Sequence, residues 1–271
     1  MTNRWGINTG LPYPVPKFDI EIAELRQRTR NVEELLDNIM EKDYQLKITN
    51  FCERFGLDTD KVMQKILDDQ IFALVFAKDP GKQTFHQNYA ANYIRGLPFI
   101  IDLVVLPSSG KNAQYVINGE VKSRVEVQNT KVKSIDFTWN YEFKEKVLKF
   151  YATHKYTRGQ GGAQDNQLED VFKFLENARQ CVNKNIFFFA ITDGNYYTVP
   201  YTKDTGFPDN KDRIEYMNAK YQGNRLKVTK SENILTDIIT VLEKWLVSNF
   251  SLDEISEEIK LLEHIKTGIS L

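Results

Sequence analysis

Apolar residues recur every three or four positions through the first third of the chain, from residue 19 to about residue 78. This spacing is typical of amphipathic helices. Gly56 interrupts the pattern, and Asp58 or Thr59 is suited to cap the helix that follows it. We therefore expect a helical N-terminal region over residues 1–80, entered through a proline-rich extended arm.

Strand-like and helical stretches alternate after the turn at Asp79-Pro80-Gly81. Short apolar runs rich in β-branched and aromatic residues suit buried strands, and longer periodic runs suit helices. Alternating elements of this kind predict an α/β core with a central mixed β-sheet flanked by helices over residues 81–271, although the whole chain could also form one compact domain. The expected strands are 99–106, 114–122 and 185–192, and the expected helices are 84–95, 141–156, 167–182 and 233–248, with a shorter helix from Leu252.

One carboxylate, Asp102, stands inside the apolar run Phe-Ile-Ile-Asp-Leu-Val-Val. Burying it alone would cost several kcal/mol, so it must lie at a sheet end or edge, or meet a cation. The next expected strand carries Glu120 and Lys122, which are two residues apart and therefore share a face. If the two strands form a hairpin, two carboxylates and an amine converge.

Such a group suits Mg²⁺ chemistry. Asp102, Glu120 and the backbone carbonyl of Val121 supply oxygen ligands of the kind Mg²⁺ prefers. Lys122 would orient the attacking water or stabilise charge that builds on a phosphodiester. The predicted catalytic residues are therefore Asp102, Glu120 and Lys122, with Mg²⁺ as the cofactor.

This arrangement resembles the PD-(D/E)XK nuclease superfamily, whose pattern is an Asp on one strand and Glu/Asp-X-Lys on the next. Here the pattern is met by Asp102 and Glu120-Val121-Lys122, with Ile101 in place of the usual proline before the Asp. The resemblance covers roughly residues 84–200. It implies a restriction-endonuclease-like core and Mg²⁺-dependent hydrolysis of DNA.

Two other interpretations of these residues stay open. Asp136 with Glu142-Phe143-Lys144 is a rival match, although these residues fall in an expected loop and an expected helix. In the plainest interpretation, Glu120 and Lys122 form a solvated ion pair on the surface of a hairpin. Gln87, on the helix before the first strand, would be an outer partner of a metal site.

A glycine- and amide-rich stretch from Arg158 to Gln167 leads into a helix. Arg suits guanine and Asn or Gln suits adenine in the major groove, and glycines let the backbone approach the duplex. The stretch resembles the recognition element of EcoRI-like restriction endonucleases, but it could also be a surface connection capped at Asp165 or Asn166. The expected DNA-binding residues are Arg124, Gln128, Arg158, Gln160, Gln164, Asn166 and Gln167.

Charge and composition agree with local DNA binding. The net charge of −1 counts against a protein that coats nucleic acid, yet residues 122–158 hold nine basic residues and four acidic ones. No apolar run approaches the roughly 18 residues of a membrane span, and the N-terminus lacks a signal-peptide core, so a cytoplasmic protein is expected. Cys52 and Cys181 are expected to be buried thiols.

The sequence thus predicts a type II restriction endonuclease. A homodimer would cut double-stranded DNA at a short palindromic site, because two-fold symmetric DNA is suited to a two-fold symmetric protein. A cognate DNA methyltransferase would act on the same site. The alternatives are a repair or recombination nuclease of the same fold and a non-catalytic DNA-binding protein.

Overall fold

The computed structural model describes residues 4–7, 13–127, 132–159, 162–204, 206 and 211–269, without the side chains of residues 82, 83, 162–165 and 269. The chain divides into two compact units. A helical unit comprises Asp19–Tyr89, and a sheet unit comprises Met1–Phe18 together with Ala90–Leu271. The first 18 residues are therefore grouped with the sheet, and the division falls at Tyr89, inside α5 (Phe85–Arg95).

The helical unit has its own apolar core. The expected helices are confirmed as α1 (Ile20–Asp37), α2 (Lys42–Phe55), α3 (Thr59–Asp68) and the short α4 (Gln70–Ala73). Gly56 ends α2 in the left-handed conformation, and the Asp58 carboxylate accepts the Lys61 N–H to cap α3. The core is made by residues from all four helices and the segment after them, among them Leu35, Ile48, Ile66 and Phe76.

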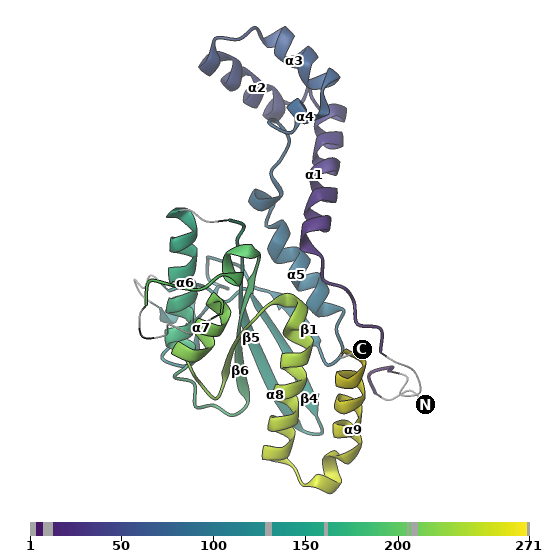
Figure 1. Ribbon diagram of the computed structural model, residues 1–271, viewed down its shortest axis with the longest axis vertical. Helices are drawn as coiled ribbons and strands as arrows, with labels where there is room; N and C mark the ends of the chain where they lie inside the picture. Colours follow the sequence, from purple (N-terminus) through teal and green to yellow (C-terminus); the bar gives the residue numbers. More distant parts are fainter. Residues whose placement is uncertain are drawn as a thin grey trace. The chain divides into compact units, whose positions relative to one another are not determined.

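A five-stranded mixed sheet forms the centre of the other unit, in the order β1-β4-β5-β6-β7 (Figure 1). The first three strands in this order pair antiparallel and the last three pair parallel. Their bounds are β1 (Ile101–Val105), β4 (Phe137–Phe143), β5 (Lys146–Tyr156), β6 (Ile186–Asp193) and β7 (Leu226–Thr229). The expected α/β class with a mixed sheet is confirmed.

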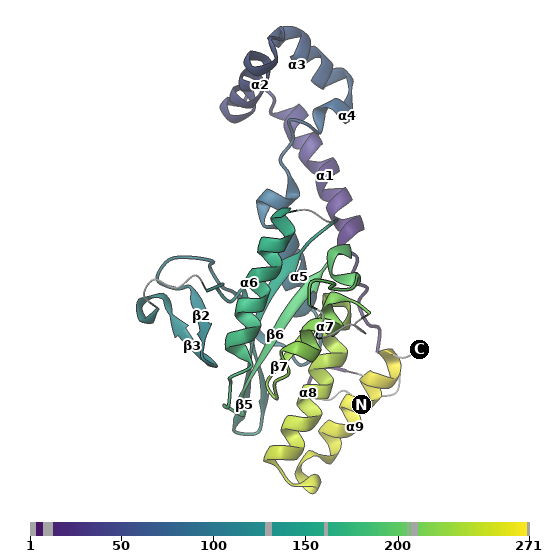
Figure 2. The ribbon, with the colours of Figure 1, turned by 60° about the vertical axis from the view of Figure 1, so that its left-hand side comes forward.

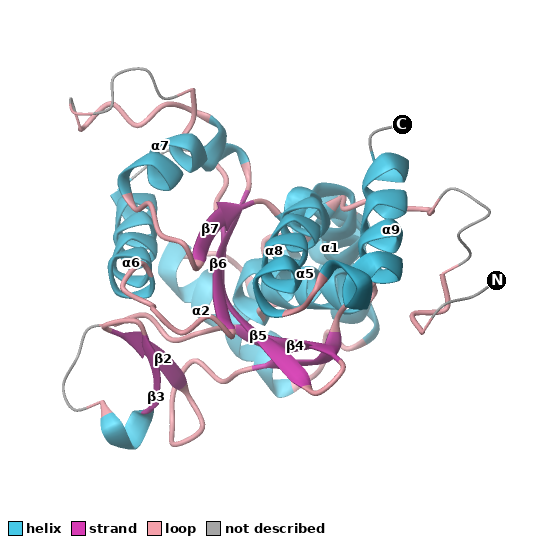
Figure 3. Cartoon of the chain, turned by 90° about the horizontal axis from the view of Figure 1, so that it is seen from below, coloured by secondary structure: helices cyan, strands magenta, loops and turns pink. Residues whose placement is uncertain are grey.

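Helices cover both faces of this sheet (Figures 1 and 3). The C-terminal part of α5, with α8 (Ile234–Asn249) and α9 (Leu252–Ile269), packs on the face that presents Trp139, Phe150 and Phe189. Helices α6 (Gly162–Ala178) and α7 (Arg213–Lys220) pack on the face that presents Tyr151 and Phe188. Within the described residues, no helix is both long and apolar enough to cross a bilayer.

The expected helix over residues 141–156 is wrong. This stretch is the end of β4, a turn at Lys144 with φ 53°, and β5. Alternate residues of β4, namely Phe137, Trp139, Tyr141 and Phe143, are buried, and such a period of two is typical of a strand. The sequence pattern does not predict helix α7 or the edge strand β7. The Asn218 side chain of α7 donates to the Val228 carbonyl and accepts the Val228 N–H, and so it covers this edge of the sheet.

The expected hairpin between strands 99–106 and 114–122 is also wrong. β1 pairs with β4, while residues 114–123 fold back on themselves as β2 (Gln114–Ile117) and β3 (Glu120–Ser123), a separate two-stranded sheet beside α6 (Figures 2 and 3). Asn118 and Gly119 connect them with φ of 52° and 81°. Two left-handed residues in an Asn-Gly pair are typical of a tight hairpin turn, which fixes the local pairing.

Gly119→Ala should destabilise the sheet unit more than the same change at a free turn. A Cβ at Gly119 would lie 2.6 Å from backbone atoms of Gln180 and Cys181, in addition to the cost of its positive φ. We expect a loss of about 3 kcal/mol in unfolding free energy, measured by urea denaturation. Gly110→Ala is the control, because its φ is 83° and nothing lies within 4 Å of the added Cβ; it should cost about 1 kcal/mol. Equal losses at both positions would contradict the close packing of the hairpin on the segment that follows α6.

Candidate functional site

Asp102 lies on the edge strand β1, where the pairing with β4 shifts between Ile101 and Val104. Its backbone is left-handed, with φ 51°, and its side chain is exposed to solvent. Solvent therefore satisfies the carboxylate that interrupts the apolar run. An irregularity with an exposed charge also protects a sheet edge from pairing with other chains.

Glu120 and Lys122 do share a face of β3, as expected, and their charged groups are 3.2 Å apart. The two side chains are 73% and 33% exposed, so this is a surface ion pair of small energetic value. Val121 between them packs toward α6. Because β3 pairs with β2 and β1 pairs with β4, strand pairing does not bring Asp102 to Glu120 and Lys122.

The rival match is divided along one strand. Asp136 immediately precedes β4, whereas Glu142 is near its other end, six residues or roughly 20 Å away. Lys144, in the turn that follows, pairs with Glu254 of α9. Asp136 and Glu142 therefore cannot bind one ion together.

A different group of polar side chains gathers at one end of the sheet. β4 begins there, and the parallel strands β5, β6 and β7 end there. Buried polar residues are usually hydrogen-bonded, and a concentration of them at strand ends is a common feature of binding sites. The buried members of this group are Ser134, Asp136, Thr153, His154, Thr157, Thr192, Asp193, Thr229 and Ser231.

Asp136 is the buried carboxylate on the α6 side of this group, only 3% exposed. Its Oδ2 accepts hydrogen bonds from the Thr153 hydroxyl (3.0 Å) and the His154 backbone N–H (2.8 Å). Its Oδ1 accepts one from Lys133 Nζ at 3.1 Å. These donors compensate the cost of burying the negative charge.

Lys155 lies two residues after Thr153 on β5, so both side chains belong to the same face of the sheet. Lys155 Nζ is 3.3 Å from the Asp170 carboxylate of α6. The end of β5 and the first half of α6 thus place a lysine and a second carboxylate on the face that holds Asp136.

His154 points to the opposite face, where its ring lies near Phe137. Its Nε2 is 3.0 Å from Asp193 Oδ2, at the end of β6. Ser231 donates to the same Asp193 carboxylate through its hydroxyl (2.7 Å) and its backbone N–H (2.9 Å). This buried network connects the ends of β5, β6 and β7 behind Asp136.

The expected DNA-binding residues are divided between two places. Arg158 and Asn166 are exposed beyond the end of β5, and Gln167 nearby accepts the Thr157 hydroxyl at 2.8 Å. Arg124 is exposed after the hairpin, with its guanidinium 5.7 Å from the Tyr115 ring centre. Gln128, Gln160 and the Gln164 side chain lie outside the described residues.

The Tyr197 phenol contacts the Thr157 hydroxyl at 3.4 Å. Burial raises the pKa of Tyr197 to about 12, so its phenol stays protonated at neutral pH.

A divalent cation at this end of the sheet would rest on few protein ligands. Within the described ranges, no three His, Cys, Asp or Glu side chains are grouped so that they could hold a metal ion. Asp136 offers a buried carboxylate beside the Thr153 hydroxyl, and Asp170 offers a second carboxylate beside Lys155 on the same face of the sheet. One or two carboxylates with several retained waters is the donor set that suits Mg²⁺.

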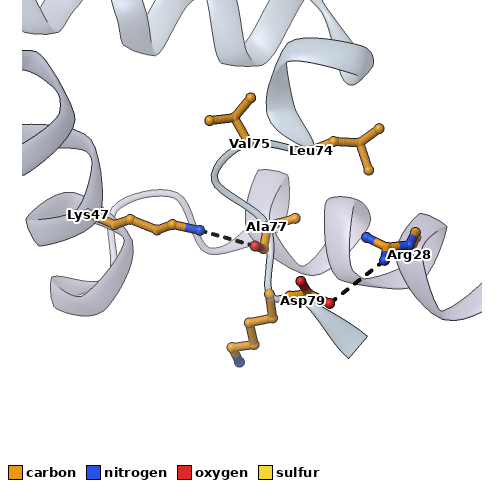
Figure 4. Close-up of a pocket in the computed structure, with 7 residues that line it drawn as sticks. Arg28, Lys47, Leu74, Val75, Ala77 and Asp79 are labelled. Atoms are coloured by element: carbon orange, nitrogen blue, oxygen red, sulfur yellow. Dashed lines mark hydrogen bonds and ion pairs between the residues drawn. The ribbon is translucent and has the colours of Figure 1, made fainter. Parts of the chain in front are cut away.

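The helical unit contains a cavity of about 540 Å³ lined by Arg28, Lys47, Lys78 and Asp79 with apolar neighbours (Figure 4). Its cations already have partners within the unit. Lys47 donates to the Phe76 and Ala77 carbonyls, Arg28 pairs with Glu24 and Asp79, and Lys78 pairs with Glu34. These contacts join α1, α2 and the segment after α4, so the cations stabilise the unit and we assign no ligand to the cavity.

Comparison with protein-family models, curated proteins and solved structures finds no match to this chain. The sequence signal that could have located it is the strict alternation that begins directly after Asp136, which identifies a strand and places Asp136 at its start.

Ser231→Ala should destabilise the sheet unit, because it removes a fully buried donor to the Asp193 carboxylate. Hydrogen bonds to charged groups contribute about 2 kcal/mol, and we expect a loss of that size in urea unfolding. Ser256→Ala on the exposed surface of α9 should cost less than about 0.5 kcal/mol. A loss at Ser231 no larger than at Ser256 would show that the network does not stabilise the strand ends.

Proposed function

We propose that this chain is a divalent-metal-dependent nuclease with a restriction-endonuclease-like core, and that Asp136, Lys155 and Asp170 form its catalytic centre. One observation carries the proposal. A buried Asp at the start of β4 lies beside β5, the antiparallel neighbour, which presents Thr153 and Lys155 on the same face.

The spatial pattern matches the one that defines PD-(D/E)XK nucleases, an Asp on one strand and acid-X-Lys on the next. In this chain, Thr153-His154-Lys155 occupies the second position, with a hydroxyl where the family has a carboxylate. Asp170 supplies the second carboxylate from α6, where it contacts Lys155. We therefore move the proposed centre from Asp102 to these residues, because strand pairing brings Asp136 to Thr153 but does not bring Asp102 to Glu120.

Each side chain has a definite task in phosphodiester hydrolysis. A bound Mg²⁺ would polarise the phosphate and lower the pKa of a bound water. Asp136, oriented by the Thr153 hydroxyl and the His154 backbone N–H, and Asp170 would hold the ion. Lys155 would orient the attacking water and stabilise negative charge on the phosphate. His154 would keep Asp136 in place through its backbone N–H.

Double-stranded DNA is the proposed substrate. Arg158 and Asn166 are exposed close in sequence to Lys155 and Asp170, on the loop and the first turns of α6. Their side chains are of the types that read guanine and adenine. As a type II restriction endonuclease, the protein would act as a homodimer on a palindromic site, protected in the host by a cognate methyltransferase.

Lys155→Ala and Lys122→Ala form a matched pair that distinguishes the two candidate centres. If Lys155 stabilises charge on the phosphate, Lys155→Ala should lower Mg²⁺-dependent cleavage of phage DNA by at least about 100-fold. Lys122→Ala removes only an exposed ion pair and should leave the rate nearly unchanged. Cleavage is measured as the rate of appearance of fragments on a gel, with DNA binding by gel shift as the second readout.

The opposite result, loss with Lys122→Ala and full activity with Lys155→Ala, would return the centre to Asp102, Glu120 and Lys122. Discrete fragments from the wild-type protein would support restriction. Smears or selective cutting of junctions would support a repair or recombination nuclease. DNA binding without cleavage under any metal condition would support a non-catalytic DNA-binding protein.

A further inference from the structure

Lys133 is the one cation within hydrogen-bonding distance of the Asp136 carboxylate among the described residues. Its Nζ is 3.1 Å from Oδ1, while Oδ2 is held by Thr153 and His154. The Lys133 side chain is 17% exposed and also contacts the Ser134 hydroxyl at 3.5 Å. The donors to Oδ2 belong to β5 and are fixed by the sheet, whereas the donor to Oδ1 is the end of the Lys133 side chain, which can move.

Two ion pairs of opposite charge lie on this face among the described residues. Lys133 pairs with Asp136, and Lys155 pairs with Asp170. A divalent ion on Asp136 would meet the ammonium of Lys133 within a few ångströms. Two like charges at that distance in a mostly buried place repel each other strongly, so the ion and the ammonium cannot both stay close to Oδ1.

We propose that Lys133 is a built-in counter-ion that competes with the divalent cation for Asp136. It neutralises the buried carboxylate until a metal ion displaces it, and it weakens metal binding by the energy of the contact that must be broken. The inference rests on the proposed function, since it takes Asp136 to be a metal ligand. Lys133 thereby determines the concentration of divalent cation at which the metal site becomes occupied.

The position of Lys133 permits such a displacement. It lies before β4, outside the five-stranded sheet, and its neighbour Ser134 is joined to β2 by a single bridge to Tyr115. The lysine side chain is a flexible four-carbon chain, so its ammonium can turn toward solvent while the backbone stays in place. Lys155, by contrast, lies on a central strand and pairs with Asp170.

Removal of the Lys133 charge should therefore have opposite effects on the metal-free and the metal-bound protein. We expect Lys133→Met to bind Mn²⁺ about tenfold more tightly than the wild type, measured by electron paramagnetic resonance without DNA. Its melting temperature should be lower without metal, and added Mn²⁺ should raise it more than in the wild type, because a ligand that binds only the folded state stabilises it. Lys133→Gln, which keeps a polar side chain, should behave in the same direction.

Lys122→Met is the control, since it deletes a half-buried ammonium that also pairs with a carboxylate, outside the proposed centre; its Mn²⁺ affinity should equal that of the wild type. The double variant Lys133→Met/Asp136→Asn should lose the gain in affinity. Equal or weaker binding by Lys133→Met and Lys133→Gln, or tight binding that survives Asp136→Asn, would overturn the role of Lys133 while leaving a metal-dependent nuclease possible. No Mn²⁺ binding by the wild type or by any variant would instead overturn the proposed function.

Discussion

The burial of the Asp136 carboxylate is the interaction on which the candidate site at this end of the sheet depends. A charge that is 3% exposed is tolerated only when donors replace the water it has lost. The Thr153 hydroxyl, the His154 N–H and the Lys133 ammonium do so, and two of the three come from the strand that pairs with β4. Correct pairing of β4 with β5 and completion of the site are therefore the same event.

The alternation of side chains along β5 separates two polar systems. Thr153 and Lys155 face α6 and meet the carboxylates at which we propose chemistry. His154, between them, faces the other layer and is held by Asp193, which Ser231 fixes in turn. The network on the His154 face fixes the ends of three strands. It thereby keeps Thr153 and Lys155, on the α6 face, at constant separation, which metal-dependent catalysis requires.

The candidate residues divide according to how far apart they are in sequence. Glu120 and Lys122 were correctly placed on one face of a strand, because two residues of one strand share a face whatever the strand pairs with. Asp102 was placed beside them only by assuming that neighbouring strands pair. The sequence offers Asp136 only as part of a rival match, because residues 141–156 predict a helix where the structure has strands. Asp170 gave no signal, since a carboxylate on an exposed helix face is common.

The sequence by itself determined the helical character of residues 20–73, the α/β class, the strand around Phe188, and the helices α5, α6 and α8, because their periodic apolar patterns are local properties. Only the tertiary structure decided which strands are neighbours. A period of two fixes the face that a side chain occupies, but it does not identify the partner strand. Here the Asn118-Gly119 turn closed β2 on β3, and so β1 paired with the more distant β4. That choice left Asp102 exposed on an edge strand, whereas the pairing of β4 with β5 brought Asp136 to Thr153.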